Sequence, residues 1–133
     1  MIVYLDSVVV IYAVEGPKAF RQRALERLAR SRDDRDEFRV SDLTWLECRV
    51  KPLRLNDPDL LRDFEDFFSQ ADLVQVELPF PIYDRAAKIR AVYQYGLADS
   101  IHLAAAVHFG CHLFLTNDRR IDRFADIAVE VLA

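Results

Sequence analysis

At 133 residues, with 52% hydrophobic and 30% charged side chains, the chain has the size and composition of one globular domain that needs neither disulfides nor a structural metal. No apolar run approaches the length of a membrane span, and the N-terminus lacks a secretory signal pattern, so we expect no membrane association. The net charge of −4 argues against a protein that simply coats nucleic acid.

The cysteines and the basic residues add two expectations. Cys48 and Cys111 stand alone and far apart, which suits a reducing cytoplasm better than a disulfide framework. All basic residues except Lys18, Lys51 and Lys88 are arginine, the better bidentate partner for phosphate. Arginine-rich helices are also ordinary solvated surface, so composition alone does not assign a phosphate partner.

Short strand signals alternate with helical periodicity along the whole chain. In chain order we expect a strand at Ile2–Leu5 running into a turn or short helix, a helix at 17–32, a strand at 38–40, helices at 43–50 and 57–68, a strand at 73–78, helices at 81–95 and 97–110, a strand at 113–115, a short helix at 119–124 and a strand at 127–132. Gly96 and Gly110 are expected to cap the ends of the two helices that precede them.

This alternation predicts a single α/β domain over residues 1–133, with a mostly parallel central sheet covered by helices on both faces. In such folds ligands bind at the carboxyl ends of the strands, where the strand order reverses. The polar residues that directly follow a strand are therefore the first candidates for a site.

Four acidic residues in apolar surroundings meet that condition. Asp6 follows the first strand and Asp118 follows the strand at 113–115, so both point toward the same edge of the sheet. Glu47 lies one turn into a helix that itself follows a strand, and Asp99 lies in the first turn of a very apolar helix. Burying a lone anion is costly, so each is expected to be capped, paired or bound to a cation.

Taken singly, each acid also has an ordinary structural explanation. Asp6 and Asp118 suit the caps of the turns that follow them. Glu47 is placed to pair with Lys51 at i,i+4, and Asp99 to interact with the positive end of its helix. Spacing alone does not prove that the four meet, but separate surface pairs would not require apolar flanks.

If the four acids converge, their mutual repulsion calls for a cation. An all-oxygen site without His or Cys ligands suits a hard ion, Mg²⁺ or Mn²⁺. Such ions bridge to phosphate oxygens and activate water, and the expected reaction is therefore phosphodiester hydrolysis without a covalent intermediate.

The stretches "VYLDSVVVIYAVEG", "TWLECRVKPLR", "YGLADSIHLAAA" and "LFLTND" together resemble the PIN-domain ribonucleases, and more narrowly the VapC-type toxins of bacterial toxin–antitoxin pairs. The resemblance covers essentially the whole chain, in order. It implies a three-layer α/β/α fold with a sheet of about five strands. It also implies that the acidic metal-binding and catalytic positions are Asp6, Glu47, Asp99 and Asp118, with polar neighbours Ser7, Thr116 and Asn117.

The same resemblance implies partners and a substrate. The chain would be the toxin of a type II toxin–antitoxin system, usually dimeric, whose VapB-like antitoxin covers the active-site groove. Its substrate would be structured RNA such as tRNA or rRNA, cut with Mg²⁺, for which Mn²⁺ can substitute. Arg49, Arg119 and Arg120 lie close in sequence to the acids and are candidates for holding the phosphate backbone.

One departure from the family pattern leaves alternatives open. The family usually has a small polar residue two places after the first acid, and here that residue is Val8. A catalytically silent protein-binding module therefore remains possible. A phosphatase or phosphoacceptor domain fits less well, because its second acid is missing at that place. The stretch "HFGCH" suggests zinc only weakly, since a fourth ligand is missing. His102 shares a helix face with Asp99 and is expected to be a core residue or a hydrogen-bond donor behind the site.

Overall fold

A computed structural model describes residues 1–132 of the chain and contains five strands, six α-helices and a short 3-10 helix within them. Their order is β1 (Ile2–Leu5), α1 (Ser7–Glu15), α2 (Lys18–Asp33), β2 (Glu37–Ser41), α3 (Asp42–Arg54), α4 (Pro58–Phe68), β3 (Leu73–Val76), α5 (Phe80–Tyr93), α6 (Leu97–His108), β4 (Leu113–Thr116), η1 (Arg119–Arg123) and β5 (Ala128–Val131).

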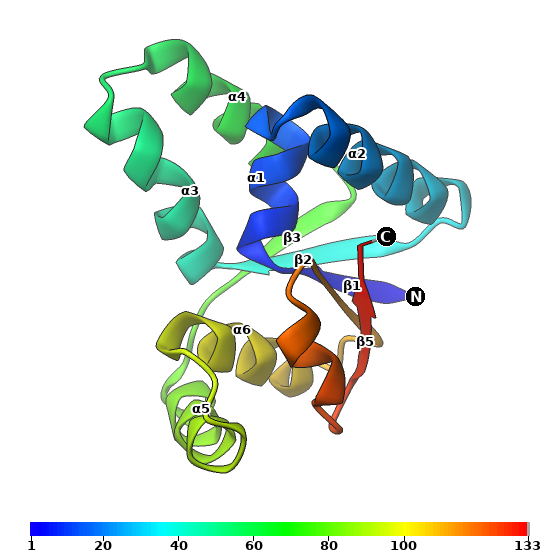
Figure 1. Ribbon diagram of the computed structural model, residues 1–133, viewed down its shortest axis with the longest axis vertical. Coiled ribbons are helices and arrows are strands. Elements are labelled where there is room, and N and C mark those ends of the chain that lie inside the picture. Colours follow the sequence, from blue (N-terminus) through cyan, green and yellow to red (C-terminus); the bar gives the residue numbers. More distant parts are fainter. Residues whose placement is uncertain (133) are drawn as a thin grey trace.

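The five strands form one parallel sheet in the order β3-β2-β1-β4-β5. In this sheet Val3 of β1 lies between Phe38 of β2 and Leu113 of β4. Figure 1 shows the sheet in the middle of the molecule, with α1 to α4 on one side and α5 and α6 on the other. The predicted three-layer α/β/α fold with a five-stranded parallel sheet is confirmed.

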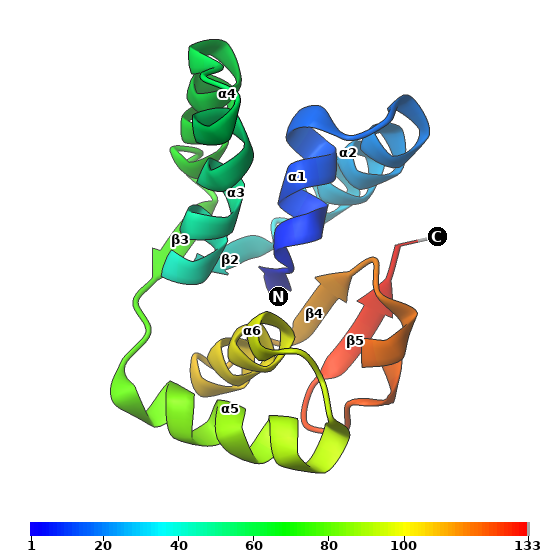
Figure 2. The same cartoon turned by 60° about the vertical axis from the view of Figure 1, so that its left-hand side comes forward.

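The period-two pattern of the central strands explains the two cores. Val3 and Leu5 of β1 pack under α1 to α4, whereas Tyr4 between them packs against α5 and α6. In β4, Leu115 belongs to the first core and Phe114 to the second, where its ring stacks on that of Tyr4 at 5.4 Å. Both faces of the sheet are therefore buried, as a parallel sheet requires. The turned view in Figure 2 shows α5 as the outermost element beneath α6.

Several predicted boundaries shift for local reasons. Helix α3 continues past residue 50 to Arg54 and includes Pro52, and it begins with a capping box between Ser41 and Thr44. Strand β3 ends at Val76 and not at residue 78, because its partner β2 ends at Ser41, opposite Val76. Within residues 1–132 no helix is both long and apolar enough to cross a membrane.

The two glycine caps have different outcomes. The prediction that Gly96 ends α5 is wrong: Gln94 takes the left-handed conformation there with φ 60°, and Gly96 is instead the N-cap of α6. Gly110 has φ 68° just past the end of α6 and allows the tight connection into β4, as predicted.

Candidate active site

The site lies where the strand order reverses. The chain runs from β1 outward to β2 and β3, and it returns to the other side of β1 with β4. Asp6 is the residue directly after β1, and its backbone N–H donates to the carbonyl of Leu115 at 2.9 Å. Asp118 lies two residues after β4. The two acids therefore come from neighbouring strands on either side of the switch point, the usual ligand position of such sheets.

One open cleft of about 440 Å³ at this edge is lined by all four predicted acids. They come from four separate parts of the chain: the ends of β1 and β4, the second turn of α3 and the first turn of α6. The remaining residues of its lining are Ser7, Val8, Ile11, Asn117 and Arg119. The prediction that the acids meet is supported by this shared cleft.

Asp6 is the most buried of the four, with 7% of its surface exposed. One carboxylate oxygen accepts from the backbone N–H of Ser7 at 2.8 Å, and the other accepts from the hydroxyl of Thr116 at 2.7 Å. Burial raises the pKa of Asp6 and the charge of Glu47 adds to this, while His102 and these two hydrogen bonds oppose it. Asp6 is thus a fixed carboxylate that also caps α1.

Asp99 is different, because within residues 1–132 its carboxylate makes no hydrogen bond or ion pair. It is half-buried in the first turn of α6. Burial raises the pKa of Asp99, and the negative charges of Asp6 and Asp118 raise it further against the opposing effect of Arg120 and His102. A half-buried carboxylate held beside two others without a partner is the chemical feature expected of a cation ligand.

Asp118 is held by a cation of its own chain. Arg120 donates from Nε to both of its carboxylate oxygens at 3.1 and 3.2 Å and from a terminal nitrogen at 2.6 Å. The backbone N–H of Arg120 also donates to Asp118, which therefore caps η1. These contacts with Arg120 hold the pKa of Asp118 below its usual range.

Glu47 is tied into a buried polar chain. Its carboxylate accepts from the Ser7 hydroxyl at 2.7 Å and from His102 Nε2 at 2.6 Å, and His102 Nδ1 is hydrogen-bonded to the Tyr4 hydroxyl at 2.8 Å. Burial raises the pKa of Glu47, but the contacts with His102 and Ser7 outweigh it and leave the pKa lowered.

This polar chain does not form a nucleophilic triad. In such a triad the ring nitrogen away from the serine is oriented by a carboxylate. Here Ser7 and Glu47 share Nε2 of His102, and the other nitrogen is bound to Tyr4. His102 is 1% exposed, so it is a core residue that also orients Glu47. In the sequence, the only indication that His102 lies near the acids is its position three residues after Asp99, on the same helix face.

By donor type, the cleft fits a hard divalent ion, since four carboxylates line it and Asp99 has no hydrogen-bond or ion-pair partner in residues 1–132. However, no three His, Cys, Asp or Glu side chains in residues 1–132 lie close enough together to hold one ion. The contacts above explain this, because Asp118 is turned to Arg120 and Glu47 to His102. Binding an ion would require Asp118 to exchange its arginine for it.

The other predicted residues have different surroundings. Thr116 is buried beneath the cleft, bound to Asp6, and Asn117 reaches the Tyr12 hydroxyl only at 3.5 Å. Arg49 does not line the cleft, because its guanidinium stacks over Trp45 at 4.8 Å and pairs with a carboxylate of α4 at 3.2 Å. Val8 lines the cleft and packs against the core.

The pairing of Glu47 with Lys51 is wrong. Lys51 instead pairs with Glu15 at the end of α1, at 3.1 Å, and Glu47 turns inward to His102. Glu47 therefore remains in the cleft.

A parallel α/β domain with an acidic cleft at its switch point defines the class of the protein. A comparison with protein-family models identifies the family within that class: the PIN domain model matches residues 3–127. The chain therefore belongs to the PIN domain family. A search of curated proteins found no match.

Similar solved structures include two VapBC complexes and FitAcB. VapBC2 from Rickettsia felis bound to a promoter DNA fragment matches with a TM-score of 0.78, 16% identity and full coverage of both chains. DNA-bound VapBC from Salmonella typhimurium gives 0.78 at 20% identity, over 100% of this chain and 99% of the other. FitAcB from Neisseria gonorrhoeae gives 0.70 at 18% identity, over 96% and 95%. At these identities the likeness concerns the fold.

Proposed function

We propose that the chain is the toxin component of a type II toxin–antitoxin system and acts as a Mg²⁺-dependent endoribonuclease that hydrolyses phosphodiester bonds in RNA, with tRNA or rRNA as the substrate. The observation that carries the proposal is the cleft at the switch point of a PIN domain that is lined by Asp6, Glu47, Asp99 and Asp118. A cluster of carboxylates, one of them unpaired, is suited to bind a divalent cation. A divalent cation in such a cleft can promote hydrolysis of a phosphodiester.

Asp6, Asp99 and Asp118 would hold the ion, with Glu47 completing the site. A bound divalent ion would supply activation of water and stabilisation of the leaving oxygen. Thr116 and the backbone N–H of Ser7 fix the Asp6 carboxylate, and the Ser7 hydroxyl fixes Glu47. The carboxylates of Asp6 and Glu47 are therefore held in place by hydrogen bonds, and the carboxylate of Asp99 would be available to bind the ion.

Arg119 and Arg120 would hold the phosphate backbone beside the acids. Arg119 lines the acidic cleft, and Arg120 lies on Asp118 with 79% of its side chain exposed. Once a divalent ion replaces Arg120 at Asp118, the guanidinium is free to bind a phosphate.

A VapB-like antitoxin and a second copy of the chain are the proposed protein partners. Support for the antitoxin comes from the VapBC complexes among the similar structures and from apolar side chains left exposed on α3 next to Glu47, namely Leu46, Val50 and Leu53. Phe80 and Tyr83 of α5 are exposed on the outermost helix and offer a surface for dimer formation. The buried free thiols of Cys48 and Cys111 agree with a cytoplasmic location.

A silent protein-binding module is the second candidate, and the observation that favours it is that no three acids are gathered closely enough for one ion. Metal titration distinguishes the two, because anything that binds the folded state alone raises its stability. A silent module would show no thermal stabilisation by Mn²⁺ or Mg²⁺.

The decisive experiment is RNA cleavage by the purified chain and by Asp99→Asn. The wild type should cut RNA with Mg²⁺ and lose this activity in excess EDTA. Asp99→Asn should lose cleavage while keeping the fold, measured by circular dichroism. Asp84→Asn, an exposed aspartate on α5, is the matched control and should cut like the wild type. Full activity of Asp99→Asn, or of the wild type in EDTA, would contradict the proposal.

A further inference from the structure

A second cleft adjoins the acidic one and carries the opposite charge. It has a volume of about 470 Å³ and is lined by Tyr93, Gln94, Tyr95, Arg119, Arg120, Asp122 and Arg123. The two clefts share Arg119, and Arg120 binds the carboxylate of Asp118 in the acidic cleft. Helix η1 is thus the common wall of the two clefts, and an RNA strand bound across the acids would pass the second cleft.

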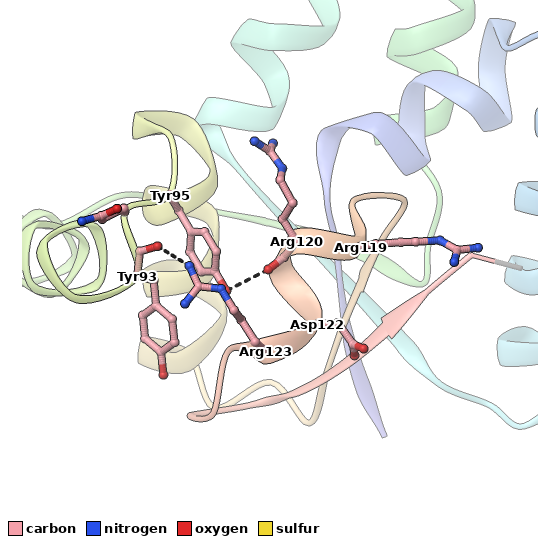
Figure 3. Close-up of a pocket in the computed structure, with 7 residues that line it drawn as sticks. Tyr93, Tyr95, Arg119, Arg120, Asp122 and Arg123 are labelled. Carbon is pink, nitrogen blue, oxygen red and sulfur yellow. Dashed lines mark hydrogen bonds between the residues drawn. The ribbon is translucent and has the colours of Figure 1, made fainter.

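The core of this second cleft is a guanidinium on an aromatic platform. The rings of Tyr93 and Tyr95 stack at 5.2 Å with an interplanar angle of 11°, and Arg123 lies 5.3 and 5.0 Å from their centroids. Arg123 also donates to the backbone carbonyl of Tyr93, and the Tyr95 hydroxyl donates to that of Arg120. Figure 3 shows Arg123 turned back toward both rings. Its charge is held in place before any ligand arrives.

The positive charge of this cleft is only partly neutralised by the protein. Three arginines and Asp122 line it, in a chain whose net charge is −4. Within residues 1–132, Arg119 and Arg123 form no salt bridge, in contrast to Arg120. Unpaired arginines beside aromatic rings are the usual composition of a nucleic-acid contact.

The arginines are spread out, which points to a long ligand. Figure 3 shows Arg119 and Arg120 extending in different directions away from the tyrosines. At about 2 Å rise per residue, η1 spaces Arg119 and Arg123 roughly 8 Å apart along its axis. A small phosphate ester would need converging donors, whereas a polyanion is matched by donors in a row.

We propose that the cleft between the α5–α6 connection and η1 holds an unpaired nucleotide of the RNA strand, next to the phosphodiester at the acidic cleft, with Arg123 on its phosphate and Tyr93 against its base. This inference rests on the proposed RNA cleavage and adds a substrate requirement. Tyr93 is only partly buried, with Tyr95 stacked on its ring and Phe124 edge-on to it, and its exposed part is the surface that a base would contact. Aromatic stacking requires a base that is not already stacked in a duplex, which selects loops and single strands.

RNA binding without cleavage tests the proposal. Fluorescence anisotropy would follow a labelled single-stranded oligonucleotide and a fully paired duplex of the same sequence, with EDTA and Asp99→Asn as the common background. Arg123→Ala should weaken single-strand binding several-fold and lower the salt slope by about 0.7, the value for one lost phosphate contact. Arg123→Lys keeps the positive charge but loses the planar guanidinium. Its affinity for the single strand should therefore lie between that of the background protein and that of Arg123→Ala.

The matched control for Arg123→Ala is Arg23→Ala. Arg23 is an exposed arginine over an aromatic ring, Phe20 at 5.0 Å, on α2 and outside both clefts. It should leave binding unchanged. Tyr93→Phe should bind like the background, while Tyr93→Leu should lose about fivefold or more on the single strand, the usual effect of one lost stacking contact.

The outcomes separate this inference from the proposed function. Cleavage of RNA by the wild type together with unchanged binding by Arg123→Ala and Tyr93→Leu would overturn the subsite and leave the nuclease standing. Equal losses on the paired duplex would overturn the requirement for an unpaired nucleotide. An effect of Arg123→Ala on an acidic peptide but not on RNA would reassign the cleft to a protein partner. Absence of both RNA binding and cleavage in the wild type would overturn both proposals.

Discussion

Replacing Asp99 by asparagine should stabilise the metal-free protein. The substitution keeps the shape of the side chain and removes no hydrogen bond, because the Asp99 carboxylate makes none within residues 1–132. It does remove a charge that lies close enough to Asp6 and Asp118 to raise the pKa of Asp99. Pairs of like charges near a protein surface repel by about 1–3 kcal/mol at separations of several ångströms, and Arg120 and His102 offset part of this.

We therefore expect a net gain of about 1 kcal/mol in the free energy of unfolding, or about 3–5 °C in Tm for a chain of this size. The measurement is thermal unfolding in EDTA at neutral pH and low salt, with Asp84→Asn as the surface control. Because the folded pKa of Asp99 is raised, its penalty is fully present above that pKa and disappears as the pH falls toward the unfolded value of about 3.9. The gain should shrink over the same range.

Saturating Mn²⁺ should reverse the order of the two proteins. The wild type would gain about 2.7 kcal/mol at a free concentration one hundred times Kd, and Asp99→Asn would gain much less. A loss of stability for Asp99→Asn in EDTA would refute the idea that Asp99 is repelled by its neighbours. Equal stabilisation of both proteins by Mn²⁺ would refute its role as a ligand.

Three further predictions concern the surroundings of the cleft. His102→Ala leaves a cavity and removes a hydrogen-bond partner from the Tyr4 hydroxyl, so it should lower the free energy of unfolding, measured in urea, by about 2–4 kcal/mol. His108→Ala, at an exposed position of the same helix, is the control and should have little effect. Burial raises the pKa of the Cys48 thiol to about 12 and that of Cys111 to about 11. Both thiols should therefore react slowly with Ellman's reagent at pH 8 in the native protein and quickly in denaturant; fast native reaction would contradict this. Val8→Ser should leave RNA cleavage within a few-fold, since other groups already hold both oxygens of Asp6, and a large rise in activity would show that Val8 impairs the site.

The fold could be predicted well because its signals are local. Short apolar strands alternating with amphipathic helices specify a parallel sheet with two covered faces, and the alternation of Val3, Tyr4 and Leu5 fills both cores. The ends of the helices were predicted less accurately than the helices themselves, because helix ends depend on tertiary contacts. Gln94 adopts a left-handed conformation that a glycine two residues later was expected to take.

That the four acids lie at one edge of the sheet could also be predicted, because they follow strands or lie in the first two turns of helices. Their pairing could not, since it depends on which long side chains reach them in three dimensions. Glu47 turns to His102, 55 residues away, and not to Lys51 on its own helix. The tyrosine platform under Arg123 was missed for the same reason: the two elements that form it are about 30 residues apart.

Arg120 connects the two clefts, and its removal should therefore affect metal and RNA in opposite directions. Its guanidinium contacts both oxygens of Asp118, so it would compete with an ion for that carboxylate. The pair is exposed to solvent, which keeps the competition weak, and Arg120→Ala should tighten Mn²⁺ binding only a few-fold in calorimetric titration. The same variant should weaken single-stranded RNA binding, because a phosphate contact is lost.

The control variant is Arg119→Ala. Arg119 lines both clefts but pairs with no acid in residues 1–132, so its replacement should weaken RNA binding without tightening metal binding. Unchanged or weaker Mn²⁺ affinity in Arg120→Ala would mean that Arg120 does not compete with the ion for Asp118.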